Sequence, residues 1–203
     1  QQNDSRHIRT LAELNAVTYG DNMIADLNAG INITDTLEQL LISTDGRIDK
    51  FDIIADRMMA DYVRSIQVAP GGIVTDIYPA EGNEAGKIDL IHDKYRGETV
   101  NYSIANDVLI IHGPFELEQG GHVLSIRNPV FLQDEKGTPY FWGMTMVIIK
   151  VPDIFQHSAD ALTNFGYQYR LSKTISPLTD EYTVVDQSEE TLMDPVSYDF
   201  TLG

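Results

Sequence analysis

The first third of the chain carries apolar residues at the spacing of an amphipathic helix. Between Asp4 and Val63 most apolar positions recur at steps of three, four or seven residues. The first of them are Ile8, Leu11, Leu14, Val17, Ile24, Leu27 and Ile31. This spacing predicts one long amphipathic helix. Such a stripe is typical of core or helix–helix packing, and a helical stalk is the more specific interpretation.

Two shorter helices are predicted behind the first. Asp35 and Glu38 have the spacing of a capping box, which predicts a new helix start there and an end near Gly46. Apolar residues then recur at steps of three and four over 48–62, which predicts a third helix.

Beyond Val63 the pattern changes to the alternation of β-strands. Two β-rich runs over 65–70 and 73–79 are separated by Gly71 and Gly72, and this arrangement predicts a hairpin. The segment 94–106 predicts a short helix, so that residues 80–106 form a connector over the sheet. Three further strands are predicted over 108–111, 121–130 and 138–150.

These elements predict an α+β fold organised around an antiparallel sheet. We expect a helical stalk over 1–62, a sensory lobe over 63–153 and a second, smaller lobe over 154–203. In the second lobe the pattern predicts a helix over 154–165 and strands over 167–171 and 183–186. The last residues, 198–203, alternate as in another strand. We therefore expect an excised piece of a larger protein, with the second lobe truncated.

Composition narrows the class of partner. The 203 residues include 31 Asp plus Glu against 14 Lys plus Arg, which gives a formal charge of −17, and there is no cysteine. With 42% hydrophobic residues the chain can build a core and is not an acidic disordered tail. The acidic balance argues against nucleic acid and against anionic membrane surfaces as partners. Without cysteine, folding needs no particular redox compartment.

The sequence lacks the motifs of an enzyme or of a cofactor site. The five histidines form no HExxH helix and no pair at metal-ligand spacing. There is no nucleophile elbow, no phosphate loop and no dinucleotide fingerprint. No stretch approaches the roughly 18 apolar residues that span a bilayer. We expect a non-catalytic domain with no cofactor and no metal site.

Several blocks of the sequence resemble one known family in the same order. The first block is Arg64–Pro79 with its continuation Glu81–Leu90, and three shorter blocks follow at Gly113–Leu117, Arg127–Phe131 and Phe141–Met144. Together they resemble the CHASE domain, the cyclase- and histidine-kinase-associated sensory extracellular domain, of bacterial type. The resemblance is strong over about 63–155, covers the stalk only in its helical character, and is weak over 167–203.

The resemblance implies a place in a signalling receptor. Family members have two PAS-like lobes behind a stalk helix and lie outside the cytoplasm, periplasmic or extracellular, between transmembrane segments of a plasma-membrane protein. Their cytoplasmic output is a histidine kinase or a nucleotide cyclase such as a diguanylate cyclase. We therefore expect a sensor that binds a small molecule and transmits its state through stalk helices, as a homodimer through those helices.

The resemblance also suggests ligand-binding residues. In the plant hormone receptors of the family an aspartate holds the ligand at the position of Asp89, and a hydroxyl residue stands where this chain has His112. Asp89 can accept a ligand N–H, and His112 can donate or accept. We expect Tyr78, Phe115 and Trp142 to supply apolar wall. Each residue also has a structural interpretation, as a helix cap for Asp89, a sheet-edge histidine for His112 and core for Trp142.

Two functions from different classes remain open at this point. The first is the ligand-sensing ectodomain. The second is a dimerisation or structural module of the same receptor that transmits state without a ligand, through a parallel helix–helix contact. The identity of the ligand and of the output domain lies outside what the sequence determines.

Overall fold

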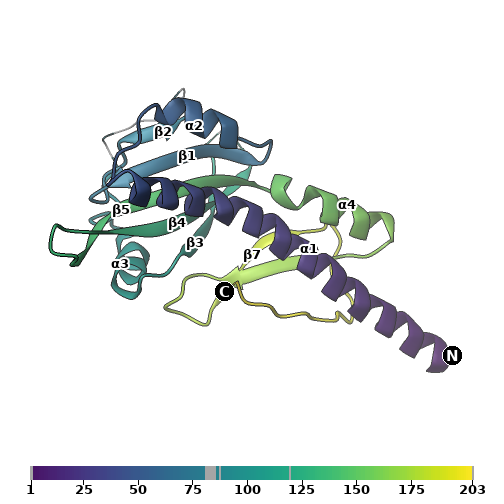
Figure 1. The fold of residues 1–203 in the computed structure, drawn as a ribbon. Helices are drawn as coiled ribbons and strands as arrows, with labels where there is room; N and C mark the ends of the chain where they lie inside the picture. Colours follow the sequence, from purple (N-terminus) through teal and green to yellow (C-terminus); the bar gives the residue numbers. More distant parts are fainter. Residues whose placement is uncertain (1, 81–85, 87, 119, 203) are drawn as a thin grey trace.

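The computed structural model describes residues 2–80, 86, 88–118 and 120–202. The chain begins with α1 (Gln2–Ser43), a 42-residue helix whose N-terminal part extends beyond the rest of the molecule (Figure 1). The other helices are α2 (Phe51–Met58), α3 (Gly97–Asn106), the 3₁₀ turn η1 (Asp153–Phe155) and α4 (Gln156–Asn164). The strands are β1 (Val63–Pro70), β2 (Asp76–Tyr78), β3 (Ile110–Glu116), β4 (His122–Gln133), β5 (Pro139–Val151), β6 (Arg170–Thr174) and β7 (Tyr182–Gln187).

The predicted second helix start at Asp35 is wrong, because α1 continues without a break to Ser43. Asp35 is exposed, and the Glu38 carboxylate accepts a hydrogen bond from Asn128 Nδ2 of β4 at 2.8 Å. Both residues therefore lie in the interior of one helix. The predicted third helix is confirmed in a shorter form, α2.

Five strands form one antiparallel sheet in the order β2-β1-β5-β4-β3. The predicted hairpin around Gly71 and Gly72 is confirmed, with β1 and β2 paired and both glycines at positive φ. The three later strands are confirmed, β3 and β4 with longer extents than predicted and β5 shifted by one residue. β4 and β5 pair along most of their length, and α1 packs on both of them.

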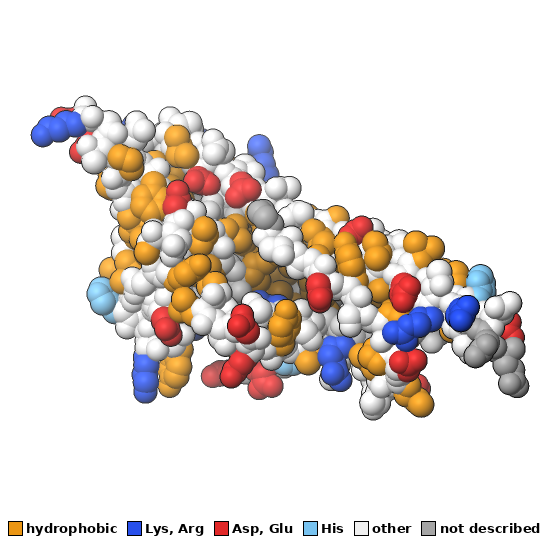
Figure 2. All heavy atoms as spheres, turned by 90° about the horizontal axis from the view of Figure 1, so that it is seen from below, with side chains coloured by type: hydrophobic (Ala, Val, Ile, Leu, Met, Phe, Trp, Pro, Cys, Tyr) orange, Lys and Arg blue, Asp and Glu red, His pale blue; other side chains and the backbone are white. Residues whose placement is uncertain are grey.

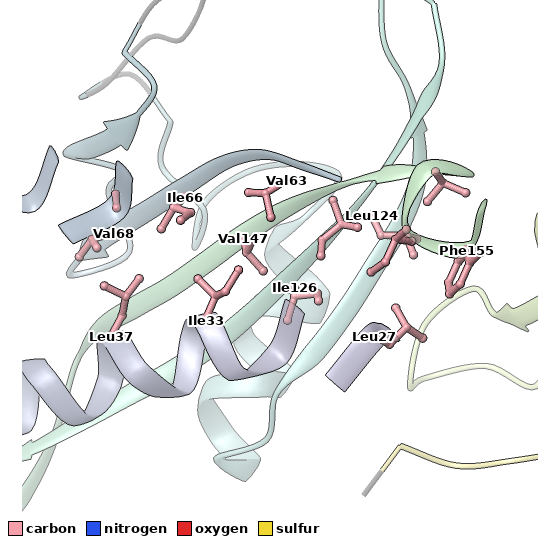
Figure 3. Close-up of a cluster of buried hydrophobic side chains, with 14 of the residues drawn as sticks. Leu27, Ile33, Leu37, Val63, Ile66, Val68, Leu124, Ile126, Val147 and Phe155 are labelled. Atoms are coloured by element: carbon pink, nitrogen blue, oxygen red, sulfur yellow. The ribbon is translucent and has the colours of Figure 1, made fainter. Parts of the chain in front are cut away.

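One face of the sheet, the helix face, packs against α1 and α2. Alternate residues of β4 and β5 point to it, with Leu124 and Ile126 on β4 and Val147 and Ile149 on β5. From α1 the side chains Leu27, Ile33 and Leu37 point toward these strands (Figure 3). Gly30 allows a close approach, because a Cβ there would lie 2.4 Å from Ile149 Cδ1. This interface is the main core, and it also includes Ile66, Val68, Phe155 and Val185.

The opposite face, the connector face, is covered by the chain between β1 and β3. Its apolar cluster joins Met144 and Met146 of β5 to Val100 of α3, and Val74 and Leu90 complete it. The predicted connector helix is thus confirmed as α3. Toward β3 and β4 this face also carries polar residues.

The C-terminal part forms a separate two-stranded sheet of β6 and β7. Asn15 Nδ2 donates to the Tyr167 hydroxyl at 3.2 Å, and the Tyr198 hydroxyl donates to Asp21 at 2.7 Å, so this part rests on α1. The predicted strand over 198–203 is wrong for the described residues, because 198–202 form no strand. The division into domains stays a prediction.

None of the described helices has both the length and the hydropathy required to cross a bilayer.

Candidate functional site

The structure divides four of the five predicted site residues between the two faces of the sheet, and the fifth, Asp89, lies at the start of a turn in the connector. Tyr78 and Trp142 pack against the core on the helix face. The Tyr78 hydroxyl donates to Asp56 Oδ1 of α2 at 2.5 Å, and this hydrogen bond raises the pKa of the phenol. His112 and Phe115 lie on the connector face. The structure therefore does not bring Tyr78 and Trp142 together with His112 and Phe115, because the pleat directs Tyr78 away from His112, and their roles in ligand binding stay predictions.

Trp142 lies beside the end of α1. A Cβ on Gly46 would meet its indole Nε1 at 2.4 Å. The cavity next to it has a volume of about 70 Å³ and is lined mostly by apolar side chains, among them Leu41 and Phe51. Ligand pockets for small molecules usually measure some 300–1,000 Å³, so this cavity is too small for such a ligand in the present conformation. A wider surface depression of about 400 Å³ lies between the end of α1 and α2, around Leu40 and Ile54.

Asp89 caps the turn that follows it. Its carboxylate accepts hydrogen bonds from the backbone N–H groups of Ile91 and His92 at 3.1 and 3.2 Å, and from His92 Nδ1 at 2.8 Å. The bond from the His92 side chain and those from the backbone lower the pKa of Asp89. The structure thus shows the capping interaction, and a role in ligand binding stays a prediction.

His112 and Phe115 lie together at the edge of the sheet. Their rings make an edge-to-face contact with centroids 4.9 Å apart. Between them the β3–β4 pairing is interrupted by a bulge at Gly113 and Pro114. Gly113 has a φ of 121°, and a Cβ there would approach Val123 O at 2.9 Å, so this bulge requires glycine.

Arg127 lies next to His112, in the middle of the connector face. The Arg127 side chain belongs to central strand β4 and is only 3% exposed. Its Nη1 donates to His112 Nδ1 at 2.8 Å. Its Nε has no hydrogen-bond acceptor among the described residues, and none of their carboxylates forms an ion pair with it. A buried guanidinium without a carboxylate is unusual, because desolvating the charge costs several kcal/mol.

Ser125 is the second buried polar residue of this region. It precedes Arg127 by two positions on β4 and therefore lies on the same face, directly opposite His112 in the β3–β4 ladder. Ser125 is 2% exposed, and its hydroxyl also lacks a partner among the described residues. We call Ser125, Arg127, His112 and Lys173 the Arg127 cluster.

Lys173 brings the second sheet into this cluster. Its Nζ donates to the Gly113 carbonyl of the β3 bulge at 3.1 Å, and to the Thr174 and Ile175 carbonyls at 2.7 and 3.3 Å. All three acceptors are neutral, so the lysine charge is not compensated by them. Burial lowers the pKa of Lys173.

The cluster is electropositive although the whole chain is acidic. Burial lowers the pKa of His112 to about 4, and the charges of Arg127, Lys173 and Arg96 act in the same direction. Burial also lowers the pKa of Arg127 to about 10. His112 is therefore neutral at pH 7, and its Nδ1 accepts from Arg127. The imidazole proton then resides on Nε2, which leaves a free donor.

Arg96 and Asp93 stand beside the cluster as a pair that is already neutralised. Arg96 Nη1 donates to Asp93 Oδ2 at 2.8 Å, and the backbone N–H groups of Tyr95 and Arg96 donate to Oδ1 at 2.8 Å each. Burial acts to raise the pKa of Asp93, but these donors outweigh it and lower the pKa. Asp93 is thus engaged by Arg96 and forms no ion pair with Arg127, although its charge still acts to raise the pKa of Arg127.

The cluster has the chemistry of a binding site for an anion. It presents unpaired donors at Arg127 and Ser125 and a neutral imidazole at His112. Among the described residues no group of three or more His, Asp or Glu is arranged to hold a metal ion. From below, the molecule is hollowed near its middle, with hydrophobic and basic side chains inside the hollow (Figure 2).

Sequence reasoning identified His112 in this cluster but assigned no role to Arg127, Ser125 or Lys173. The alternation gave no signal for Arg127, because it lies on the face opposite to the apolar Leu124, Ile126, Val130 and Leu132, where a half-buried strand carries exposed residues.

Comparisons with known proteins give a fold likeness. No protein-family model matches the chain, and no curated protein matches it. Among solved structures it is similar to one titled an extracellular ligand binding receptor from Desulfohalobium retbaense DSM5692, with a TM-score of 0.56 and 15% identity. The match covers 73% of this chain and 26% of that chain, so this chain spans about a quarter of that protein's length.

Proposed function

We propose that this chain is an extracytoplasmic ligand-sensing domain of a membrane-bound signalling receptor. It binds a small molecule on the connector face of the five-stranded sheet, at the Arg127 cluster. The likeness to the extracellular receptor supports a sensor fold. The CHASE-like sequence blocks support the finer assignment to a PAS-like lobe of that family, with a histidine kinase or a diguanylate cyclase as output.

The observation that carries the proposal is the pair of unpartnered polar groups, Arg127 Nε and Ser125 Oγ. Buried polar groups in native proteins are nearly always satisfied, and exceptions often mark a functional site. Here two exceptions lie two residues apart on one strand and face the same way. A ligand that accepts hydrogen bonds from both removes the desolvation penalty of this face.

A route for the signal exists because α1 packs on the reverse side of the same strands. Asn128, the neighbour of Arg127 on β4, donates to Glu38 of α1 at 2.8 Å. Thr145 of β5 donates to the buried Thr34 carbonyl of α1 at 3.0 Å. A ligand that shifts β4 at Arg127 therefore moves a strand that α1 holds by hydrogen bonds. The ligand can shift the equilibrium between two arrangements of the domain only by the difference between its binding free energies for them.

Thermal stabilisation against a broad metabolite library tests this function. We expect at least one compound to raise the melting temperature of the 203-residue domain, and Arg127→Met to abolish the effect. Arg170→Met is the matched control, because Arg170 is an exposed arginine on β6. A library in which no compound binds the wild-type domain contradicts the proposal.

A dimerisation module is the second candidate, and α1 provides an observation for it. Its N-terminal part, which extends beyond the body, carries exposed apolar side chains at Ile8, Leu11, Leu14 and Val17. Ile8 and Leu14 are 65% and 61% exposed. A second copy of α1 is a partner that such residues fit. Sedimentation of wild type and Leu14→Glu tests this: a dimer that the charge disrupts supports it, and a wild-type monomer contradicts it.

A further inference from the structure

We infer that the ligand of the Arg127 cluster is a small monocarboxylate with an apolar body. The inference rests on the proposed function and names the chemical class that the site selects. It stands on the geometry around Arg127, and each feature of that geometry restricts the ligand further.

The first restriction is the sign and size of the charge. Of the three cations around His112, Arg96 is paired with Asp93 at 2.8 Å and Lys173 has three carbonyl acceptors. Arg127 alone combines a full charge with a free N–H, at Nε. One guanidinium with a free N–H is matched by one carboxylate, since the three donors of the Lys173 ammonium are already engaged by carbonyls and Arg96 is paired with Asp93.

The second restriction is the shape of the charged group. With Nη1 engaged by His112, the Nε side of the guanidinium remains free, and the Ser125 hydroxyl lies on the same face of β4. A planar carboxylate can accept from Arg127 with one oxygen and from Ser125 with the other. The fork geometry of arginine is matched to such a group.

The third restriction is the apolar surroundings. In the sheet Arg127 stands between Ile110 of β3 and Met146 of β5, which are its cross-strand partners. The Phe115 ring packs on His112 at the rim. These neighbours favour a ligand with a hydrocarbon portion and disfavour inorganic phosphate, which has none. The His112 Nε2–H adds one donor for a polar substituent on that portion.

The site is closed in this conformation, because Ser125 Oγ and Arg127 Nε are shielded from solvent. An acid reaches them only when side chains at the rim move, and His112 and Phe115 of β3 are partly exposed there. Lys173 ties this same segment to the second sheet through Gly113. Entry of the acid therefore disturbs the contact between the two sheets.

Calorimetry on the intact 203-residue domain tests the inference with defined probes. The probes are straight-chain monocarboxylates of two to six carbons, the corresponding primary amides, and inorganic phosphate. We expect at least one acid to bind wild type, its amide to bind at least about 100-fold more weakly, and phosphate to bind more weakly than that acid. The loss follows from removing charge-assisted hydrogen bonds to a buried guanidinium.

Three variants test whether the acid binds at Arg127. Arg127→Lys keeps the charge but loses the fork, and we expect affinity for the acid to fall by about 10-fold to 100-fold. Ser125→Ala removes one donor and lowers affinity by about 10-fold. Arg170→Lys is the matched control and leaves affinity unchanged. Because Arg127→Lys retains a cation and Ser125→Ala is a small change, a folded variant is available for the comparison.

The outcomes separate the inference from the proposed function. The inference is overturned if acid and amide bind equally, if phosphate binds more tightly than every acid, or if Arg127→Lys binds as wild type does. It is also overturned if no acid binds. A neutral or cationic library compound that binds while no acid does leaves the sensing function in place. If no compound of the library binds, both the inference and the proposed sensing function are contradicted.

Discussion

His112 predicts a measurable dependence of stability on pH. Burial and the neighbouring charges of Arg127, Lys173 and Arg96 hold its pKa at about 4 in the folded protein, against 6.5 for the free side chain. Asp93 is the one acidic neighbour that acts in the opposite direction. Between pH 4 and 6.5 the unfolded chain therefore binds a proton that the folded protein does not. The free energy of unfolding must rise with pH across this window.

The size of the effect follows from the two pKa values. Each unit of difference corresponds to about 1.4 kcal/mol, so the full window is worth at most about 3 kcal/mol. Between pH 7.5 and pH 5 the linkage relation gives about 2 kcal/mol. Because the imidazole is partly exposed, we discount this to about 1–2 kcal/mol. The stabilisation is complete above pH 6.5 and is lost as pH falls toward 4.

The measurement is a comparison of wild type with His112→Asn. Asparagine does not titrate, and its carbonyl can still accept a hydrogen bond from Arg127. Urea unfolding of both proteins at pH 7.5, 6 and 5 gives the difference in unfolding free energy, in which the contributions of the many surface carboxylates cancel. We expect the advantage of wild type over the variant to shrink by about 1–2 kcal/mol between pH 7.5 and 5.

A second variant and a direct measurement complete this prediction. Arg127→Met removes one of the charges that lower the pKa of His112, so we expect an NMR titration to show a higher pKa for His112 in this variant than in wild type. The reasoning is refuted if wild type and His112→Asn show the same pH dependence over this range. It is equally refuted if the advantage of wild type grows as the pH falls.

Three further predictions concern stability and are checked by urea unfolding at pH 7.5. Gly143→Ala places a Cβ 2.4 Å from the Ala69 carbonyl oxygen on β1, and we expect the free energy of unfolding to fall by more than about 3 kcal/mol because the backbone must move. Gly137→Ala, at positive φ in open space, should lower it by only about 1 kcal/mol. Equal losses in the two variants would contradict the argument. Leu37→Ala removes a fully buried side chain of α1 from the main core and should cost about 3–5 kcal/mol, whereas a cost below about 1 kcal/mol would mean that α1 is not bound to the sheet as described. Arg127→Met removes an uncompensated buried charge and should leave stability equal or higher by about 1–3 kcal/mol, and a loss of several kcal/mol would show that the charge is compensated in the folded protein.

The secondary structure followed largely from local patterns. The steps of three and four along the N-terminal third predicted α1 and α2, and the alternation after Val63 predicted the strands of the five-stranded sheet and the hairpin at Gly71 and Gly72. These predictions succeed because side-chain periodicity is set by the backbone geometry of each element. The α+β class follows from the same patterns.

The prediction of a helix start at Asp35 is wrong because different hydrogen-bond donors compete for the capping carboxylate. The carboxylate of Glu38 can bond to a backbone N–H at a helix start or to a side chain on another element. In the folded protein Asn128 of β4 is within 2.8 Å, and the apolar residues of α1 on both sides of Asp35 pack on one sheet. Continuous burial of one helical face outweighs a local signal for a break.

The site depended still more on tertiary structure. Tyr78 and His112 are both strand residues with suitable chemistry, but the strand pleat directs Tyr78 to the helix face and His112 to the connector face. A shift by one residue in either strand would reverse this. Which aromatic residues share a pocket is therefore a property of register and sheet order, which the one-dimensional pattern does not contain.

The sequence by itself determined the helical first third, the antiparallel strands, the acidic balance and the absence of cysteine chemistry. Tertiary structure alone decided the electrostatics of the proposed site. Arg127 is an ordinary charged residue in the sequence and becomes a buried guanidinium with a free N–H only because β3, β5 and the connector exclude water from it while the nearby carboxylate of Asp93 is held by Arg96. Charge is a local property of a residue, whereas its solvation and its partners are set by the whole fold.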